Sequence, residues 1–299
     1  MKDADLEQLF DSLRLRVEKN KGAPIERVLR SPLRLPWSKL MEKICQATHK
    51  TMTLKASTFW GDEMNVVFPE LVSCFFYRYG YFEADLTKIV MMNVKPGQTF
   101  FDVGTHFGYY SMLASKLVGQ DGQVHSFEPT AETYKVVKSN VGSRANVTLN
   151  NLAGWSEETT IRFKDYGTQY SAFNSLYGAK LADSVIGKIK PKEYNVKTIS
   201  MDKYIADTGA RPDFIKIDAE NAEYDILKGM ANTLRDVRPA ISLEVGDVNE
   251  GEYMDSSASV HFLLDHNYGA FEFRDGELHV HTPTKKYKYS NLLFLPQKK

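Results

Sequence analysis

Short apolar runs alternate with amphipathic stretches from about residue 98 onward in this 299-residue chain. Apolar runs bounded by turn signals are typical of buried parallel strands, whereas apolar residues three and four apart indicate helices. Strands are expected within 99–103, 124–128, 146–154, 159–165, 212–218, 239–245 and 291–296, and helices within 109–118, 131–141, 223–234 and 260–267. Repeated strand–helix units predict an α/β fold with an open, doubly wound, mostly parallel sheet, whose ligands bind beyond the carboxyl ends of the strands. The Asp275–Gly276 pair predicts a late hairpin that adds an antiparallel edge.

The first part of the chain has a different pattern. Residues 3–19 carry an apolar stripe at helical spacing, and Leu40–Ala47 is helical again after three prolines that divide the chain into short pieces. From Ser57 the composition becomes aromatic and β-branched, as in a hairpin or a strand that leads into a helix. We therefore expect a helical N-terminal extension over 1–56 and the main domain over 57–299.

Charge and composition narrow the class of protein. The 38 basic and 38 acidic residues cancel, so no global field draws the chain to nucleic acid or to an anionic membrane, and no nucleic-acid partner is expected. Residues 1–60, however, hold twelve Lys and Arg against seven Asp and Glu, which indicates either a solvated helical surface or a contact with an anionic partner. The extension could also join two copies of the chain in a homo-oligomer.

Location is predicted from what the sequence lacks. No apolar run approaches the ~20 residues of a membrane span, and MKDADLEQLF at the N-terminus has no apolar segment like that of a signal peptide. Cys45 and Cys74 cannot form a disulfide framework, which favours a reducing compartment. We expect a cytoplasmic protein without a membrane span.

The segment FFDVGTHFGYYS, residues 100–111, places a turn with two glycines at the end of a predicted strand. Gly104 and Gly108 let the backbone turn tightly and approach a ligand that a Cβ atom would exclude. A nucleoside triphosphate would require a lysine where tyrosines stand, and a dinucleotide would require glycines at the positions of His106 and Tyr109. Neither ligand fits this turn.

Asp102, at the mouth of the turn, favours S-adenosylmethionine. A pyrophosphate would lie close to this carboxylate at an electrostatic cost, whereas S-adenosylmethionine has no phosphate and carries ammonium and sulfonium groups. Glu128 ends the next strand, where a carboxylate can accept hydrogen bonds from both ribose hydroxyls. NAD enzymes use the same device, so Glu128 supports a ribose without choosing the cofactor. The predicted cofactor site comprises Asp102, Gly104, Thr105, Phe107, Gly108, Tyr109 and Glu128, together with Glu83 from an earlier segment.

Several motifs resemble those of the FkbM-type S-adenosylmethionine-dependent methyltransferases. The likeness rests on FFDVGTHFGYYS, FEP, DFIKIDAENAEYDILKG and RPAISLEV, and extends to FWGDEMNVVFPE, YRYGYFEADLT and VKTISMDKYI. It covers roughly residues 57–299 and little of the first 56. The resemblance implies a Rossmann-like class I methyltransferase fold and methylation of a hydroxyl in a sugar or natural-product pathway. The sequence departs from the family at His106, where Asn is common, and at Asn221, where Gly is common.

The segment FIKIDAENAE is the most charged strand end in the chain. Lys216 and Asp218 share one face of the strand, and a lysine inside a strand needs a partner, for which Asp218 and Glu244 are the natural candidates. In one interpretation these residues only form a buried ion pair, while Glu220 and Glu223 favour the start of the next helix through its dipole. In the other, Asp218 and Glu244 face the transferred methyl group.

Methylation of a hydroxyl requires removal of its proton as the new bond forms. A carboxylate or His106 could act as the general base. Alternatively, Asp218 and Glu244, together with Asp247, could hold Mg, Mn or Ca, which would lower the pKa of the hydroxyl. The predicted catalytic residues are therefore Asp218, Glu244, Lys216 and His106, with Asp218 and Glu244 as the metal ligands if a metal is used.

Other segments border the predicted site. Glu83, near Tyr81, could close over the cofactor or simply begin a helix, and Asn174 and Ser175 lie in a loop that could line the acceptor pocket.

Three functions remain open. The first is an O-methyltransferase whose acceptor is a sugar, a nucleotide sugar or a glycan. The second is O- or N-methylation of a polyketide or peptide natural product. The third is a methyltransferase-like binding module, against which the intact Asp102, Gly104, Gly108 and Glu128 argue.

Overall fold

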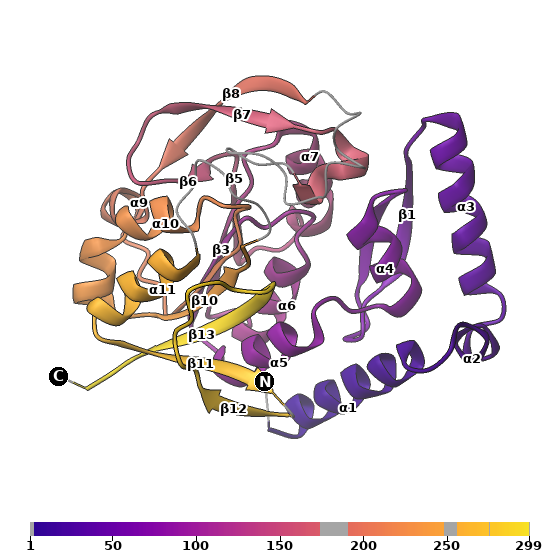
Figure 1. Cartoon of the computed structure of the whole chain (residues 1–299), viewed down its shortest axis with the longest axis horizontal. Coiled ribbons are helices and arrows are strands. Elements are labelled where there is room, and N and C mark those ends of the chain that lie inside the picture. The colour runs from indigo at the N-terminus through magenta and orange to yellow at the C-terminus, as the bar shows by residue number, and fades with distance from the viewer. Residues whose placement is uncertain (1–2, 174–190, 248–255, 275, 299) are drawn as a thin grey trace.

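A computed structural model describes residues 3–173, 191–247, 256–274 and 276–298 of the chain. Its centre is an eight-stranded sheet of order β12-β11-β13-β10-β9-β3-β4-β5 (Figure 1). The strands are β3 (Thr99–Val103), β4 (Gln123–Phe127), β5 (Val147–Asn150), β9 (Phe214–Ile217), β10 (Ala240–Val245), β11 (Tyr268–Arg274), β12 (Glu277–Val280) and β13 (Ser290–Pro296). The five strands β3, β4, β5, β9 and β10 pair in parallel, which confirms the predicted α/β architecture.

Alternate residues of each strand enter two different cores, one on each face of the sheet. Phe100 packs with the helices of one face and Phe101 with those of the other, because successive side chains of a strand point to opposite faces. The first face is covered by α5 (Ala84–Asn93), α6 (Tyr109–Val118) and α7 (Ala131–Val141), and the second by α9 (Met201–Thr208), α10 (Glu223–Lys228) and α11 (Ser256–Asp265). The doubly wound arrangement is confirmed.

The antiparallel part of the sheet differs from the expectation in one respect. The predicted hairpin exists as β11 and β12, and β12 forms the expected antiparallel edge. However, β13 also runs antiparallel, and it lies inside the sheet between β10 and β11. Its central residues Leu292, Leu293 and Phe294 are buried, as suits a strand covered on both faces.

Three short strands form a separate sheet of order β6-β8-β7 (Figure 1). They are β6 (Ala153–Gly154), β7 (Thr160–Asp165) and β8 (Lys192–Ile199). The strand predicted near 159–165 therefore exists but does not join the central sheet. Two further helical turns are η1 (Thr168–Phe173) and η2 (Thr233–Val237).

The N-terminal part packs along one side of the molecule. The helices α1 (Asp3–Asn20), α2 (Pro24–Arg30) and α3 (Arg34–Thr48) precede a hairpin of β1 (Met52–Ser57) and β2 (Glu63–Phe68), which leads into α4 (Leu71–Tyr79). The helices expected near 3–19 and 40–47 are confirmed. The β1–β2 hairpin spans the boundary expected at residue 57, and the division of the chain there stays a prediction. Within the described ranges no helix has the length and apolar character that crossing a bilayer requires.

Candidate active site

The strand order reverses between β3 and β9, because the chain continues from β3 to β4 on one side and returns to β9 on the other. Ligands of doubly wound sheets bind at such a switch point. A cavity of about 580 Å³ opens there, and its lining includes Gly104, His106, Glu128, Asp218 and Glu244. The structure thus brings the two predicted halves of the site, cofactor and acceptor, to one cavity.

Both predicted glycines occupy positions that a side chain would disturb. Gly104 has a φ of +79°, and a Cβ atom on it would lie 1.7 Å from the carbonyl oxygen of Asp218. Gly108 has a φ of +91°, and its Cβ would lie 2.8 Å from a methyl group of Val137 in α7. The packing of the chain itself therefore requires both glycines, and their contact with a cofactor stays a prediction.

Asp102 lies beneath the turn and is fully buried. Its Oδ2 accepts hydrogen bonds from the hydroxyls of Thr105 (2.8 Å) and Ser111 (2.6 Å), and its Oδ1 lies 3.6 Å from Nζ of Lys216. Since the side chain is held by these groups and is not part of the cavity lining, its observed role is to position the turn. The direct attraction between Asp102 and a bound cofactor stays a prediction.

Glu128 lines the cavity at the end of β4. Its Oε2 accepts from the backbone N–H of His106 (3.1 Å) and its Oε1 from that of Thr130 (2.9 Å). Burial raises the pKa of Glu128 to about 7, although these backbone hydrogen bonds oppose the shift. Each carboxylate oxygen can accept more than one hydrogen bond, so Glu128 retains the capacity to accept ribose hydroxyls.

His106 forms part of the cavity wall in a left-handed conformation, with a φ of +49°. Its Nε2 lies 2.8 Å from Oγ of Ser171, and its ring stacks on that of Phe107 with 3.9 Å between the centroids. Burial lowers the pKa of His106 to about 4, against the opposing charge of Asp218. The imidazole is therefore neutral at pH 7 and a weak base.

The remaining predicted turn residues contribute differently. Thr105, Phe107 and Tyr109 are buried and line the cavity. The hydroxyl of Tyr109 lies 3.0 Å from that of Thr87 in α5, and burial raises the pKa of Tyr109. This tyrosine joins α6 to α5 as well as forming the cavity wall.

Lys216 is buried in β9 and stays charged. Its Nζ lies 3.2 Å from Asp218 and 3.6 Å from Asp102, and it donates to the carbonyl oxygen of Gly104 (3.2 Å). Burial alone would lower the pKa of Lys216, but the nearby carboxylates, first that of Asp218 and then that of Asp102, outweigh it and raise the pKa. A permanently protonated amine cannot act as a base, so the contribution of Lys216 is electrostatic.

The second partner of Lys216 differs from the prediction. Glu244 was expected, but Asp102 takes this place. The reason is register: Lys216 lies directly opposite Asp102 in β3, whereas its neighbour in β10 is Ser242. Glu244 lies two residues further along β10, at the level of the cavity.

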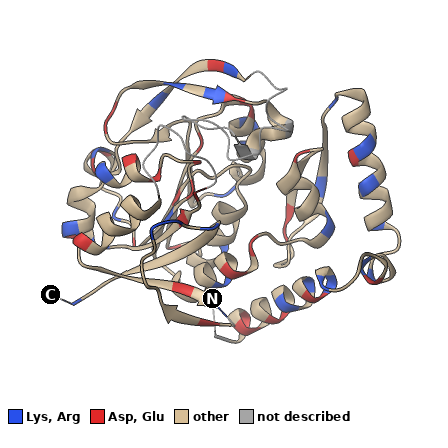
Figure 2. Ribbon diagram, in the orientation of Figure 1, with Lys and Arg blue, Asp and Glu red and all other residues tan. Residues whose placement is uncertain are grey.

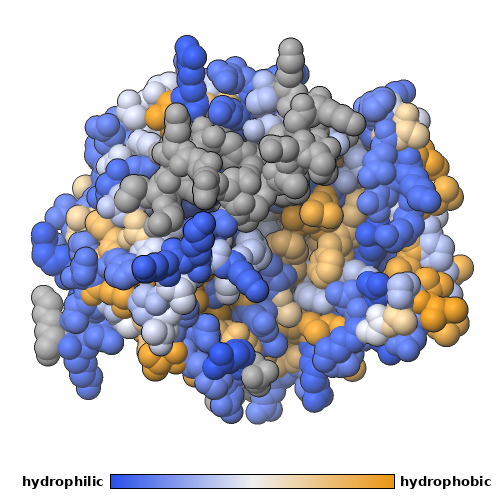
Figure 3. Space-filling model, viewed as in Figure 1, coloured by the Kyte–Doolittle hydropathy of each residue, from blue (hydrophilic) through white to orange (hydrophobic). Residues whose placement is uncertain are grey.

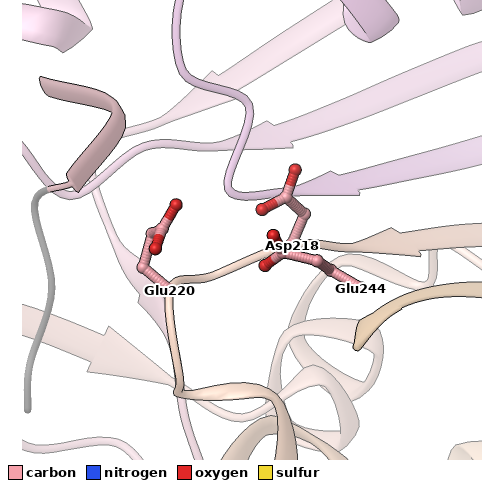
Figure 4. A group of neighbouring side chains, drawn as sticks. All are labelled: Asp218, Glu220 and Glu244. Atoms are coloured by element: carbon pink, nitrogen blue, oxygen red, sulfur yellow. The ribbon is translucent and has the colours of Figure 1, made fainter. Parts of the chain in front are cut away.

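Three carboxylates gather near the ends of β9 and β10 (Figure 4). Oxygen atoms of Asp218, Glu220 and Glu244 all lie within 4.8 Å of one another. Glu220 was expected to support the following helix, but it has a φ of +48° in the turn before α10, and this turn places it in the cluster. Asp247 lies apart, where its carboxylate accepts from the backbone N–H groups of Ser256 (2.8 Å) and Tyr287 (2.7 Å).

Glu83 connects distant parts of the chain. Its Oε2 accepts from the hydroxyl of Tyr110 (3.1 Å), and its Oε1 accepts from Tyr289 (2.5 Å) and Asn291 (3.0 Å). Burial, and then the charge of Asp218, raises the pKa of Glu83. Glu83 thus buttresses Tyr289, which lines the cavity, and its own contact with a cofactor stays a prediction.

Ser171 and Tyr289 are polar residues of the cavity wall that the sequence does not mark as site residues. Ser171 contacts His106, and Tyr289 lies 206 residues beyond its partner Glu83, so no local spacing marks either of them. Asn174 and Ser175, predicted to line the acceptor pocket, lie outside the described residues.

One part of the cavity is strongly apolar. It is formed by β2, α4 and the segment that follows α4, through the side chains of Met64, Val66, Leu71, Val72, Phe75, Phe76 and Phe82. The lining of the cavity therefore combines a carboxylate cluster with a set of apolar side chains.

Comparison with known proteins identifies the class of enzyme to which this site belongs. Residues 102–270 match the family model of the methyltransferase FkbM domain, a segment that begins at Asp102 and includes the ends of β3, β4, β9 and β10. Together with the cavity at the switch point of the sheet, the match defines an S-adenosylmethionine-dependent methyltransferase with a Rossmann-like class I fold. The matched segment is more than half of the chain, and the protein belongs to the FkbM methyltransferase family.

Individual relatives are distant. The hexuronic acid methyltransferase AglP of Haloferax volcanii is 25% identical over 158 residues, which cover 52% of this chain and 59% of that protein, less than two thirds of its length. Among solved structures, an FkbM methyltransferase from Methylobacillus flagellatus has a TM-score of 0.40 at 13% identity and covers 74% of this chain and 52% of that one. An S-adenosylmethionine-dependent O-methyltransferase from Thermotoga maritima has a TM-score of 0.40 at 14% identity, with coverage of 86% and 82%.

Proposed function

We propose that this protein is an O-methyltransferase that methylates a hydroxyl of a sugar, either free, nucleotide-linked or within a glycan. The observation that carries the proposal is the cluster of Asp218, Glu220 and Glu244 at one end of the cavity. Carboxylates accept hydrogen bonds from several hydroxyls at once, as binding of a sugar requires, and one of them can take the proton of the reacting hydroxyl. The likeness to a hexuronic acid methyltransferase supports a sugar acceptor.

The residues of the cofactor side fit S-adenosylmethionine, which supplies the methyl group from its sulfonium. In this proposal Glu128 accepts the ribose hydroxyls, while the turn from Gly104 to Phe107 forms the wall against which the cofactor lies. Asp102 and Lys216 hold that turn through their mutual ion pair and the bond from Lys216 to the Gly104 carbonyl.

Removal of the acceptor proton is assigned to Asp218. Its carboxylate is partly exposed in the cavity, with 22% of the side chain accessible, whereas His106 has a pKa of about 4 and is a weak base at neutral pH. The positive charge of Lys216, whose Nζ lies 3.2 Å from Asp218, partly offsets the combined negative charge of Asp218 and Glu244. A divalent Mg, Mn or Ca ion bound by Asp218 and Glu244, with Glu220 as a third ligand, would serve the same step by lowering the pKa of the hydroxyl.

A second candidate acceptor is a polyketide or peptide natural product. The apolar end of the cavity, with Phe75, Phe76 and Phe82 among its walls, favours an acceptor that has an apolar portion. We propose the cytoplasm as the location of the protein, in line with the free, buried thiols of Cys45 and Cys74.

The proposal is tested by methyl transfer from S-adenosylmethionine labelled in its methyl group. The purified chain is incubated with panels of sugars, nucleotide sugars, glycans, polyketides and peptides, each with magnesium and with a chelator. We expect label on a sugar oxygen, located by nuclear magnetic resonance of the product. Label confined to natural products would instead support the second acceptor class. Calorimetric binding of S-adenosylmethionine without transfer to any member of these panels would reject both proposed acceptor classes.

A further inference from the structure

Six large apolar side chains on α2, α3 and the turn between them face solvent. They are Ile25, Leu29, Leu33, Trp37, Leu40 and Ile44, with between 39% and 84% of each residue exposed. We call this set the apolar stripe. Figure 3 shows hydrophobic surface along the outer edge of the molecule where α2 and α3 lie. Isolated exposed leucines are ordinary, but a contiguous set on one element indicates a contact surface.

The apolar stripe is not the face that holds α3 in place. Leu35, Ser38 and Cys45 form the buried face of α3, which packs toward α4. There the guanidinium of Arg78 in α4 donates to Ser38 and pairs with Glu42. On the helix surface, positions 33, 37, 40 and 44 follow one another at spacings of three and four, so they share a second face. The helix α3 thus has two apolar faces. The protein buries the first, and on the second it covers part of Trp37, whose ring centroid lies 5.5 Å from that of Tyr77 in α4.

The surroundings of the apolar stripe are basic. Residues 24–50 contain six basic side chains, namely Arg27, Arg30, Arg34, Lys39, Lys43 and Lys50, against the two acids Glu26 and Glu42. Both acids are engaged, since Glu42 pairs with Arg78 and Glu26 lies 3.7 Å from Arg30. Lys39 and Lys43 are exposed, as are their sequence neighbours Leu40 and Ile44. Figure 2 shows basic positions along α3. A local positive field therefore surrounds an apolar face, although the net charge of the whole chain is zero.

We infer that α2 and α3 dock this protein on the surface of an anionic membrane, with the apolar stripe against the acyl boundary and the basic side chains at the lipid headgroups. An exposed apolar helix face flanked by Lys and Arg has the character of an interfacial helix, and Trp37 is a residue type enriched at that depth. This contact is peripheral and requires no membrane span.

A second copy of the chain is the competing occupant, and self-association through this segment was expected from the sequence. In a two-fold symmetric dimer the same patch contacts itself, so both copies would bring their exposed Lys39 and Lys43 to one interface. Like charges brought together oppose such an interface, whereas anionic headgroups neutralise the same charges. Charge complementarity therefore favours the membrane.

The test is sedimentation of the full chain with vesicles of phosphatidylcholine alone and of phosphatidylcholine with phosphatidylserine. We expect binding to the phosphatidylserine vesicles that weakens as salt is raised. The double change Lys39→Gln with Lys43→Gln should weaken this binding roughly 25-fold, since each basic residue near an anionic surface contributes about fivefold. Leu33→Gln with Leu40→Gln should weaken it at least about tenfold, through lost apolar burial.

Matched controls lie on other faces of the molecule. Val280→Gln in β12, where the valine is 78% exposed, and Lys138→Gln in α7 should leave vesicle binding unchanged. Melting curves confirm that each variant is folded, and the lysine pair keeps the test valid if the leucine pair is unstable. Absence of binding to phosphatidylserine vesicles overturns the inference, as does binding that both double variants retain. A dimer in analytical ultracentrifugation that the leucine pair dissociates, without vesicle binding, would assign the apolar stripe to a second copy.

Discussion

The carboxylates of the two halves of the site are held in different ways, and all of them except the buried Asp102 line the cavity. On the β3–β4 side, Asp102 and Glu128 accept hydrogen bonds from hydroxyls and backbone amides of nearby turns, so each is fixed by its own surroundings. On the β9–β10 side, Asp218, Glu220 and Glu244 converge on one another. Fixed acceptors suit the binding of a neutral or cationic ligand, whereas converging carboxylates suit proton abstraction or a cation. Acidic residues near the ends of neighbouring strands can therefore have different chemical roles within one site.

The largest effect on turnover should come from a change among the three carboxylates of the β9–β10 side. We expect Asp218→Asn to slow turnover by about 10²–10⁴-fold, as for loss of a general base, with little change in the affinity for S-adenosylmethionine. Turnover, calorimetric affinity and melting temperature are measured on one preparation. If Asp218 holds a metal, wild-type turnover should also vanish with a chelator and return with added divalent ion.

The control for this variant is Asp207→Asn in α9, whose carboxylate pairs with Lys203 away from the cavity. It should leave turnover unchanged. If Asp218 serves only as the ion-pair partner of Lys216, the Asp218→Asn protein will melt at a lower temperature and turn over normally, which would remove Asp218 from the mechanism.

A change on the β3–β4 side should alter the affinity for S-adenosylmethionine rather than the rate of methyl transfer. We expect Glu128→Ala to weaken S-adenosylmethionine binding by at least about 100-fold, because each hydrogen bond to a charged group contributes about 1.5–3 kcal/mol and two are lost. Isothermal calorimetry measures the change, and Glu132→Ala, exposed on α7, is the control. Unchanged affinity in the Glu128 variant would contradict the ribose assignment.

A smaller effect should come from the protonation of Glu128. Because burial raises its pKa to about 7, the carboxylate is about one tenth ionised at pH 6 and about nine tenths ionised at pH 8. Hydrogen bonds from ribose hydroxyls favour the ionised form, so affinity for the cofactor should rise about tenfold between these pH values. The Glu128→Gln protein cannot ionise there, and an equally steep rise in this variant would assign the pH dependence to another group.

Much of the fold follows from patterns that are local in the sequence. Short apolar runs such as 99–103 and helical spacing in segments such as 109–118 were sufficient to predict the doubly wound sheet and to locate its switch point. The switch point in turn explains why Gly104, Glu128 and Asp218 could be assigned to one site, since the carboxyl ends of neighbouring strands meet there.

The orientation of the site residues could not be predicted in the same way. The choice of Asp102 over Glu244 as a partner of Lys216 depends on the register between β3 and β9, which no single strand encodes. Glu220 joins the acid cluster through a left-handed turn, an unusual conformation for a residue other than glycine. The contact of Tyr289 with Glu83 depends on where β13 enters the sheet, which is a property of the complete fold.

The position of β13 also governs the order in which the protein can be assembled during translation. Both β10 and β11 leave the ribosome before residues 290–296, and until then each lacks the neighbour that the finished sheet places between them. An open strand edge of this kind is a template for misassociation, so the nascent chain passes through a stage that favours protection by a chaperone. Tyr289 and Asn291 arrive with β13, so the anchor of Glu83 and one wall of the cavity form only after the rest of the site has been synthesised.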